Sequence, residues 1–139
     1  MKPVQIVFFA ICFVLSATLL LAAAGDGLWV SKVPEKDRAR HNPFEGKPSA
    51  QAAGAKLFKQ NCASCHGDDA SGKDRHPSLL SERVRSATPG ELQWLLTNGS
   101  MKNGMPSWSR LPEPQRWQII TYLKSLQPPD GQLSANSSK

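Results

Sequence analysis

The sequence has little cysteine, few aromatic residues and fewer acidic than basic side chains. Of its 139 residues three are cysteine, aromatic residues make up 7%, and 11 Asp and Glu stand against 17 Lys and Arg. Since one domain takes roughly 100–200 residues, this length excludes a large multidomain enzyme. A domain this small usually needs a staple such as disulfides, a metal or another covalent constraint. The few cysteines indicate which constraint that is.

The longest apolar run lies at the N-terminus, where residues 4–24 carry no charge. The run ends in Ala22-Ala23-Ala24, which fits the A-x-A cleavage site of an export signal. It is also about as long as a bilayer core is thick. We therefore expect residues 1–24 to be a signal peptide or an uncleaved membrane anchor. Cys12 lies inside this run and leaves two cysteines for the rest of the chain.

Those two cysteines lie in Cys62-Ala63-Ser64-Cys65-His66, the pattern of c-type haem attachment. The thiols of Cys62 and Cys65 can each form a thioether with one haem vinyl group, and His66 can bind the iron as proximal ligand. A thioredoxin-like redox pair would follow a strand, but the preceding residues favour a helix. A zinc site would need two further ligands nearby, and only His41 and His76 remain. The motif predicts one covalent haem c.

The group that occupies the second axial position of the haem iron decides between electron transfer and the binding of small molecules. Methionine raises the potential in cytochromes c, whereas an open position favours binding or activation of small molecules. Met105 lies in a loop between predicted helices, and Pro106 favours an extended backbone there. We expect Met105 to be the ligand. Met101, four residues earlier, is an alternative that the spacing leaves open, and His76 is a rival beside the proximal loop.

Helical patterns cover much of the chain after residue 49, and no stretch alternates well enough to predict a strand. The first pattern spans residues 50–61. The second begins at Thr88-Pro89-Gly90-Glu91, where Thr88 and Glu91 fit a capping box, and it ends at Asn98-Gly99. The last runs from about residue 112 to residue 126.

Residues 50–126 resemble a bacterial class I cytochrome c domain. The shared features are Gly54 and Phe58, the Cys62 to His66 motif, His76-Pro77-Ser78-Leu79, Asn98-Gly99 through Gly104-Met105-Pro106-Ser107-Trp108, and the last helix with Tyr122. The resemblance implies an all-α bundle of about three to five helices around one covalently attached haem, preceded by an N-terminal hydrophobic helix.

The resemblance also implies roles for individual residues. Gly54, Phe58 and Tyr122 are expected where the first and last helices cross. The carbonyl group of Pro77 is expected to bind the proximal imidazole, which fixes its tautomer and orientation. His76 departs from the family, which usually has glycine before this proline.

Four segments follow from these patterns. Residues 1–24 are the signal or anchor, 25–49 a spacer rich in proline and charge, 50–128 the cytochrome c domain, and 129–139 a flexible tail. The spacer would let a tethered domain swing between partners.

We expect a mono-haem cytochrome that carries single electrons between respiratory or dehydrogenase partners, not an enzyme. The alternatives are a fixed haem subunit of a larger redox complex and a five-coordinate haem enzyme or sensor. Because thioether-linked haem is assembled after export, the domain is expected on the periplasmic side of the cytoplasmic membrane. The partners would be redox proteins, with no nucleic acid and no small-molecule substrate. Lys73 and Lys102 could steer docking onto acidic partners.

Overall fold

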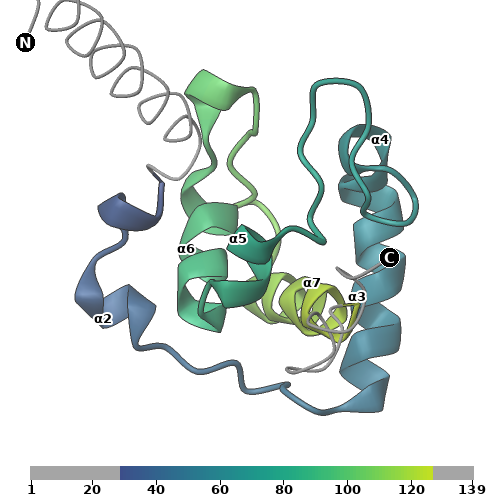
Figure 1. Ribbon diagram of the computed structural model, residues 1–139. Coiled ribbons are helices and arrows are strands. Elements are labelled where there is room, and N and C mark those ends of the chain that lie inside the picture. Colours follow the sequence, from purple (N-terminus) through teal and green to yellow (C-terminus); the bar gives the residue numbers. More distant parts are fainter. Residues whose placement is uncertain (1–28, 127–139) are drawn as a thin grey trace, which may run out of the picture. The chain divides into compact units, whose positions relative to one another are not determined.

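The computed structural model describes residues 29–126, which contain six α-helices and two 3₁₀ turns. In order these are η1 (Val30–Lys32), α2 (Glu35–Arg38), α3 (Pro48–Asn61), α4 (Ala63–His66), α5 (Glu82–Ser86), α6 (Pro89–Asn98), η2 (Met101–Asn103) and α7 (Glu113–Ser125) (Figure 1). Over this range extended pairing is limited to two isolated bridges. The predicted all-α class is confirmed, with three helices of ten residues or more and three short ones. The expected hydrophobic helix and the C-terminal tail lie outside the described residues.

The η1 turn belongs to an N-terminal unit that ends at Lys32. It is closed by a hydrogen bond of 3.1 Å from the Lys32 amide to the Trp29 carbonyl group. The elements from α2 onward belong to the second unit, which begins at Val33.

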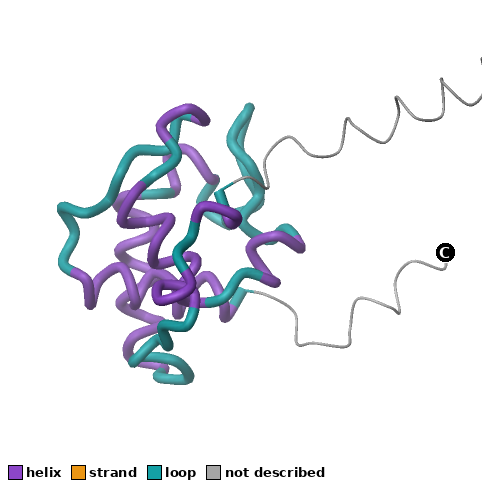
Figure 2. Tube along the Cα trace, turned by 90° about the vertical axis from the view of Figure 1, so that its left-hand side faces the viewer, coloured by secondary structure: helices purple, strands orange, loops and turns teal. Residues whose placement is uncertain are grey.

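The main contact of the second unit is the crossing of α3 and α7 (Figure 1). Helices and the loops that join them make up the described trace (Figure 2). A Cβ atom on Gly54 would stand 1.9 Å from the Gln118 carbonyl oxygen, so only glycine lets the two backbones approach this closely. Four residues further along α3, the Phe58 ring packs on the Tyr122 ring with centroids 5.4 Å apart. The crossing expected at these three residues is therefore confirmed. Ile119 and Ile120 of α7, at 1% and 0% exposure, fill the core beside it.

The N-terminus of α6 has the capping box that the sequence predicts. The Thr88 hydroxyl oxygen accepts a hydrogen bond from the Glu91 amide at 3.1 Å, and the Glu91 carboxylate accepts one from the Thr88 amide at 2.7 Å. Both bonds satisfy amide groups that the first turn of a helix leaves without partners. The helix ends at Asn98, with Gly99 after it, as expected.

Residues 33–47 pack against the domain, although the sequence predicted a spacer over residues 25–49. Val33 is buried, and Arg38 forms an ion pair with Glu91, whose side chain is 5% exposed. Asn42 is also buried and donates hydrogen bonds to the Trp117 carbonyl group at 3.1 Å and to the Thr121 hydroxyl group at 3.0 Å. Buried polar contacts of this kind fix a segment because breaking them would leave polar atoms without partners. These residues are therefore unavailable as a loose tether.

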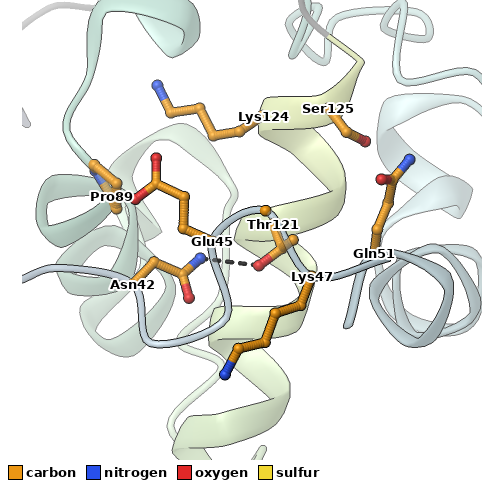
Figure 3. Close-up of a pocket in the computed structure, with 9 residues that line it drawn as sticks. Asn42, Glu45, Lys47, Gln51, Pro89, Thr121, Lys124 and Ser125 are labelled. Carbon is orange, nitrogen blue, oxygen red and sulfur yellow. Dashed lines mark hydrogen bonds between the residues drawn. The ribbon is translucent and has the colours of Figure 1, made fainter. Parts of the chain in front are cut away.

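A shallow cavity of about 260 Å³ lies beneath this segment, between Asn42 and the last turns of α7 (Figure 3). Beside it, the Lys124 ammonium group donates to the carbonyl groups of Val84, Arg85 and Ala87 at 3.2, 2.7 and 2.6 Å. Lys124 thereby fastens the C-terminal end of α5 to α7. None of the residues predicted to hold haem lines this cavity.

Candidate functional site

The Cys62 to His66 motif lies at the junction of α3 and α4. Cys62 ends α3, where its amide donates to the Phe58 carbonyl group at 2.8 Å, and it also caps α4. Helix α4 then places Cys65 and His66 one turn further on, with Cys62 and His66 half-buried and Cys65 exposed. Neither Cys62 nor Cys65 is in a disulfide. The helix geometry thus presents two thiols and an imidazole within a single turn.

The acidity of Cys62 argues against a thioredoxin-like pair. Burial, with a smaller contribution from the neighbouring Cys65, raises the pKa of the Cys62 thiol to about 11. Redox-active CxxC pairs depend on a lowered thiol pKa, because the thiolate is the nucleophile. Cys62 is therefore a neutral thiol at pH 7. A zinc site is also disfavoured, because residues 29–126 contain no cluster of three His, Cys, Asp or Glu able to hold a metal ion.

The loop after α4 turns back and places a carbonyl group against the imidazole of His66. The Nδ1 atom of His66 lies 3.0 Å from the Pro77 carbonyl oxygen. Since a carbonyl oxygen only accepts, Nδ1 carries the proton and Nε2 keeps its lone pair. Two bonds close the loop behind this contact, from the Gly72 amide to the His66 carbonyl group and from the Leu79 amide to the Ala70 carbonyl group, both 2.9 Å. Hydrogen bonds of the chain itself thus orient the imidazole.

His76 lies beside His66. The centroids of its ring and that of His66 are 6.4 Å apart, in an edge-on arrangement. A tight turn joins His76 to Lys73, whose carbonyl oxygen accepts from the His76 amide at 2.8 Å and lies 3.2 Å from its Nδ1 atom. The turn therefore accommodates histidine where the family usually has glycine, and it keeps His76 on the same loop as Pro77.

The two candidate methionines differ in how they are held. Met105 is half-buried, and its backbone pairs with Ser100 through bonds of 2.8 and 3.1 Å. Met101 lies on η2 with 72% of its surface exposed. Among the described residues the Met105 thioether makes no hydrogen bond, so its sulfur lone pairs are available. The structure thus distinguishes a fixed methionine from an exposed one, as spacing alone did not.

The candidate donor groups lie on two separate segments, one at α4 and one after η2. The loop after α4 brings Pro77 to His66, while Met105 follows η2; α4 and η2 lie on the same side of α7 in Figure 1. Two thiols, an imidazole with a bare Nε2 and a thioether suit a covalent haem c with nitrogen and sulfur axial ligands. The Ser107 hydroxyl group donates to the Thr97 carbonyl oxygen of α6 at 2.6 Å, a contact that no sequence pattern predicted. Gly99, which the sequence indicated only as a helix stop, lies so close to this segment that a Cβ atom on it would lie 2.6 Å from the Ser107 nitrogen.

Several known proteins are similar in sequence to this chain. Residues 49–123 match the sequence family described as "Cytochrome C oxidase, cbb3-type, subunit III". The chain is 29% identical over 120 residues to a cbb3-type cytochrome c oxidase subunit CcoP of Rubrivivax gelatinosus. It is 33% identical over 82 residues to the FixPc subunit of Rhizobium leguminosarum bv. viciae. These matches cover 76% and 57% of this chain but only 40% and 29% of the two relatives.

A solved structure gives the same result for the fold. Cytochrome cL of Methylophaga aminisulfidivorans superposes with a TM-score of 0.55 at 25% identity, covering 61% of this chain and 58% of that one. A cytochrome c domain implies a covalent haem c. The motif, the all-α fold and the family match over more than half of the sequence agree, and the chain belongs to the cytochrome c family of cbb3-type oxidase subunit III.

Proposed function

We propose that this chain carries single electrons on one haem c, with His66 and Met105 as the axial ligands of its iron. The observation that carries the proposal is the contact of 3.0 Å between His66 Nδ1 and the Pro77 carbonyl oxygen. This contact leaves Nε2 as the only nitrogen of the ring able to bind a metal. It also raises the basicity of the imidazole and limits its rotation.

The residues of the motif would hold the group covalently. Cys62 and Cys65 would form the two thioethers, and the bound haem would supply a one-electron Fe(III)/Fe(II) couple. Met105 favours a high potential, since a thioether stabilises the reduced state. A chain that fills both axial positions leaves no coordination site for a substrate, so we propose an electron carrier and not an enzyme.

The partners would be other redox proteins. The curated relatives are named as subunits of cbb3-type cytochrome c oxidases, which supports a second candidate function, that of a fixed haem subunit in an oxidase complex. This chain spans only 40% and 29% of their lengths. Co-purification from membranes in mild detergent separates the two functions: a fixed subunit stays with a complex of constant stoichiometry, and a carrier does not.

The domain would work on the periplasmic side of the cytoplasmic membrane. Residues 1–24, which lie outside the described range, would export the chain as a signal peptide or hold it as an anchor. No helix within residues 29–126 is long and apolar enough to cross a membrane. An intact mass of the native protein would report both the cleavage and the added mass of one haem.

The axial ligand is tested by a pair of methionine variants. Met105→Ala should abolish the weak sulfur-to-iron absorption band of the oxidised protein and let the reduced protein bind carbon monoxide. Met101→Ala is the matched control, because that side chain is 72% exposed, and it should leave the band unchanged. A band that survives in Met105→Ala would refute the ligand assignment, and rapid carbon monoxide binding by the unaltered protein would favour the five-coordinate alternative.

A further inference from the structure

The segment that carries Met105 is fastened to the C-terminal end of α6. Ser100 and Met105 exchange two backbone hydrogen bonds of 2.8 and 3.1 Å. Just after the methionine, the Ser107 hydroxyl group donates to the Thr97 carbonyl group at 2.6 Å, and the Trp108 amide donates to the Leu96 carbonyl group at 2.8 Å. The last carbonyl groups of a helix have no partner inside it. Here two of them hold the loop in place.

Gly99 makes this fastening sterically possible. Its backbone has φ +71° and ψ −173°, a combination that is essentially restricted to glycine. A Cβ atom at this position would lie 2.6 Å from both the Pro106 carbonyl carbon and the Ser107 nitrogen, and 2.8 Å from the Met105 carbonyl oxygen. Any other residue would therefore push the methionine segment away from α6.

We infer that Gly99 and Ser107 are positioning residues that keep the Met105 loop closed and so exclude small external ligands from its axial position. This inference rests on the proposed ligation by Met105. An incoming ligand can take that position only after the thioether has moved away, and the thioether moves with the backbone that Ser107 and Gly99 hold. The chain's own hydrogen bonds, and not only the sulfur-to-iron bond, then determine how often the position opens.

The first test uses Ser107→Ala, with Ser109→Ala as its matched control. Ser109 lies two residues further on, and its hydroxyl oxygen is 3.0 Å from that of Ser107 but has no bond to α6. The measurement is the rate at which imidazole binds to the oxidised haem protein, followed by loss of the sulfur-to-iron band. Ser107→Ala removes the bond to Thr97 together with the bonds to the Ser109 hydroxyl and amide groups, and it should speed binding by roughly fivefold. Ser109→Ala keeps the bond to Thr97 and should match the unaltered protein. Equal rates in the two variants would overturn the inference.

The second test compares Gly99→Ala with Gly104→Ala. Both glycines have positive φ, but a Cβ atom on Gly104 would meet nothing within 4 Å. Gly104→Ala therefore reports backbone strain in the loop without a collision. We expect imidazole to bind roughly tenfold faster or more in Gly99→Ala than in Gly104→Ala, with a weaker sulfur-to-iron band and a shifted reduction potential. Should Gly99→Ala fail to fold, the serine pair still decides the question.

The Met105→Ala protein separates a failure of this inference from a failure of the proposed ligation. If it loses the band and binds imidazole without delay, Met105 is the ligand, and the serine and glycine pairs then test only the positioning role. If it keeps the band, the ligation is refuted and the inference falls with it.

Discussion

Gly54 lies so close to Gln118 that a Cβ atom on the glycine would stand 1.9 Å from the carbonyl oxygen of its neighbour. The same atom would lie 3.0 Å from the Cβ atom of Tyr122. Because a backbone carbonyl group inside a helix cannot rotate away, the only relief is to separate α3 from α7. Helix α3 ends at Asn61, directly before Cys62, so the crossing also sets where the Cys62 to His66 motif lies.

We expect Gly54→Ala to lower the free energy of unfolding by about 1–3 kcal/mol or more. At an open helix position the same change would instead stabilise the protein by about 1 kcal/mol. The sign of the effect therefore distinguishes close packing from helix propensity. Thermal unfolding of the haem-loaded protein measures it, and a stabilised variant would show that the helices do not approach as described.

Asn42→Ala should lower the free energy of unfolding by about 1–3 kcal/mol, because the change removes three hydrogen bonds of the side chain. It also leaves the buried Thr121 hydroxyl group with one partner fewer. The neighbouring His41 is exposed, so His41→Ala is the matched control and should have little effect. Urea unfolding curves compare the two. If both variants unfold like the unaltered protein, residues 33–47 do not contribute to the stability of the fold.

Gln93→Met should stabilise the protein. The Gln93 side chain is fully buried, and neither its amide nitrogen nor its amide oxygen has a partner among the described residues. Replacing it with an apolar side chain of similar length removes a desolvation cost of about 1–3 kcal/mol. Gln60→Met, at an exposed position of α3, controls for a general effect of added methionine. A loss of stability in Gln93→Met alone would mean that the amide is bonded in the haem-loaded protein.

Glu113 should make stability depend on pH in the acidic range. A hydrogen bond from Trp117 Nε1 at 3.1 Å and, to a smaller extent, the Arg40 guanidinium group lower the pKa of Glu113. Since the folded pKa lies below the unfolded one, the ionised carboxylate stabilises the fold above the ordinary pKa of about 4.3. That stabilisation is lost as the pH falls through the lowered value.

The comparison protein for this effect is Glu113→Gln. The difference in unfolding free energy between the two proteins should be largest near neutral pH and should narrow as the pH falls through the lowered pKa of Glu113. Because the Glu113 side chain is 48% exposed, added salt should reduce the difference. A difference that stays constant with pH would show that the charge of Glu113 does not matter.

Local sequence signals predicted the parts of the fold that local interactions build. The capping box of Thr88 and Glu91 lies within one helical turn, and the crossing residues Gly54 and Phe58 share one face of α3, so pattern and resemblance located both. The Cys62 to His66 motif also lies within five consecutive residues, and its spacing therefore predicted haem attachment directly.

Contacts between distant residues could not be predicted in this way. Asn42 and Trp117, which share a hydrogen bond, are 75 positions apart in the sequence, and Arg38 and Glu91 are 53 positions apart. No periodic pattern in the sequence predicts either contact. The composition of a charged, proline-containing segment such as residues 33–47 therefore predicts a spacer even where the segment packs on the domain. The sequence favoured Met105 over Met101 through its loop position and Pro106, but it did not predict the bonds that tie the Met105 segment to Ser100 and α6.

The ion pair of Arg38 and Glu91 also sets where a recombinant fragment can begin. The family match starts at residue 49, eleven positions after Arg38, so a fragment cut at that boundary would keep the carboxylate and discard its cation. An ionised group left without its partner in a poorly hydrated position costs more than the pair contributed. A haem-bearing fragment that begins at Val33 should accordingly be obtained in better yield than one that begins at Ser49.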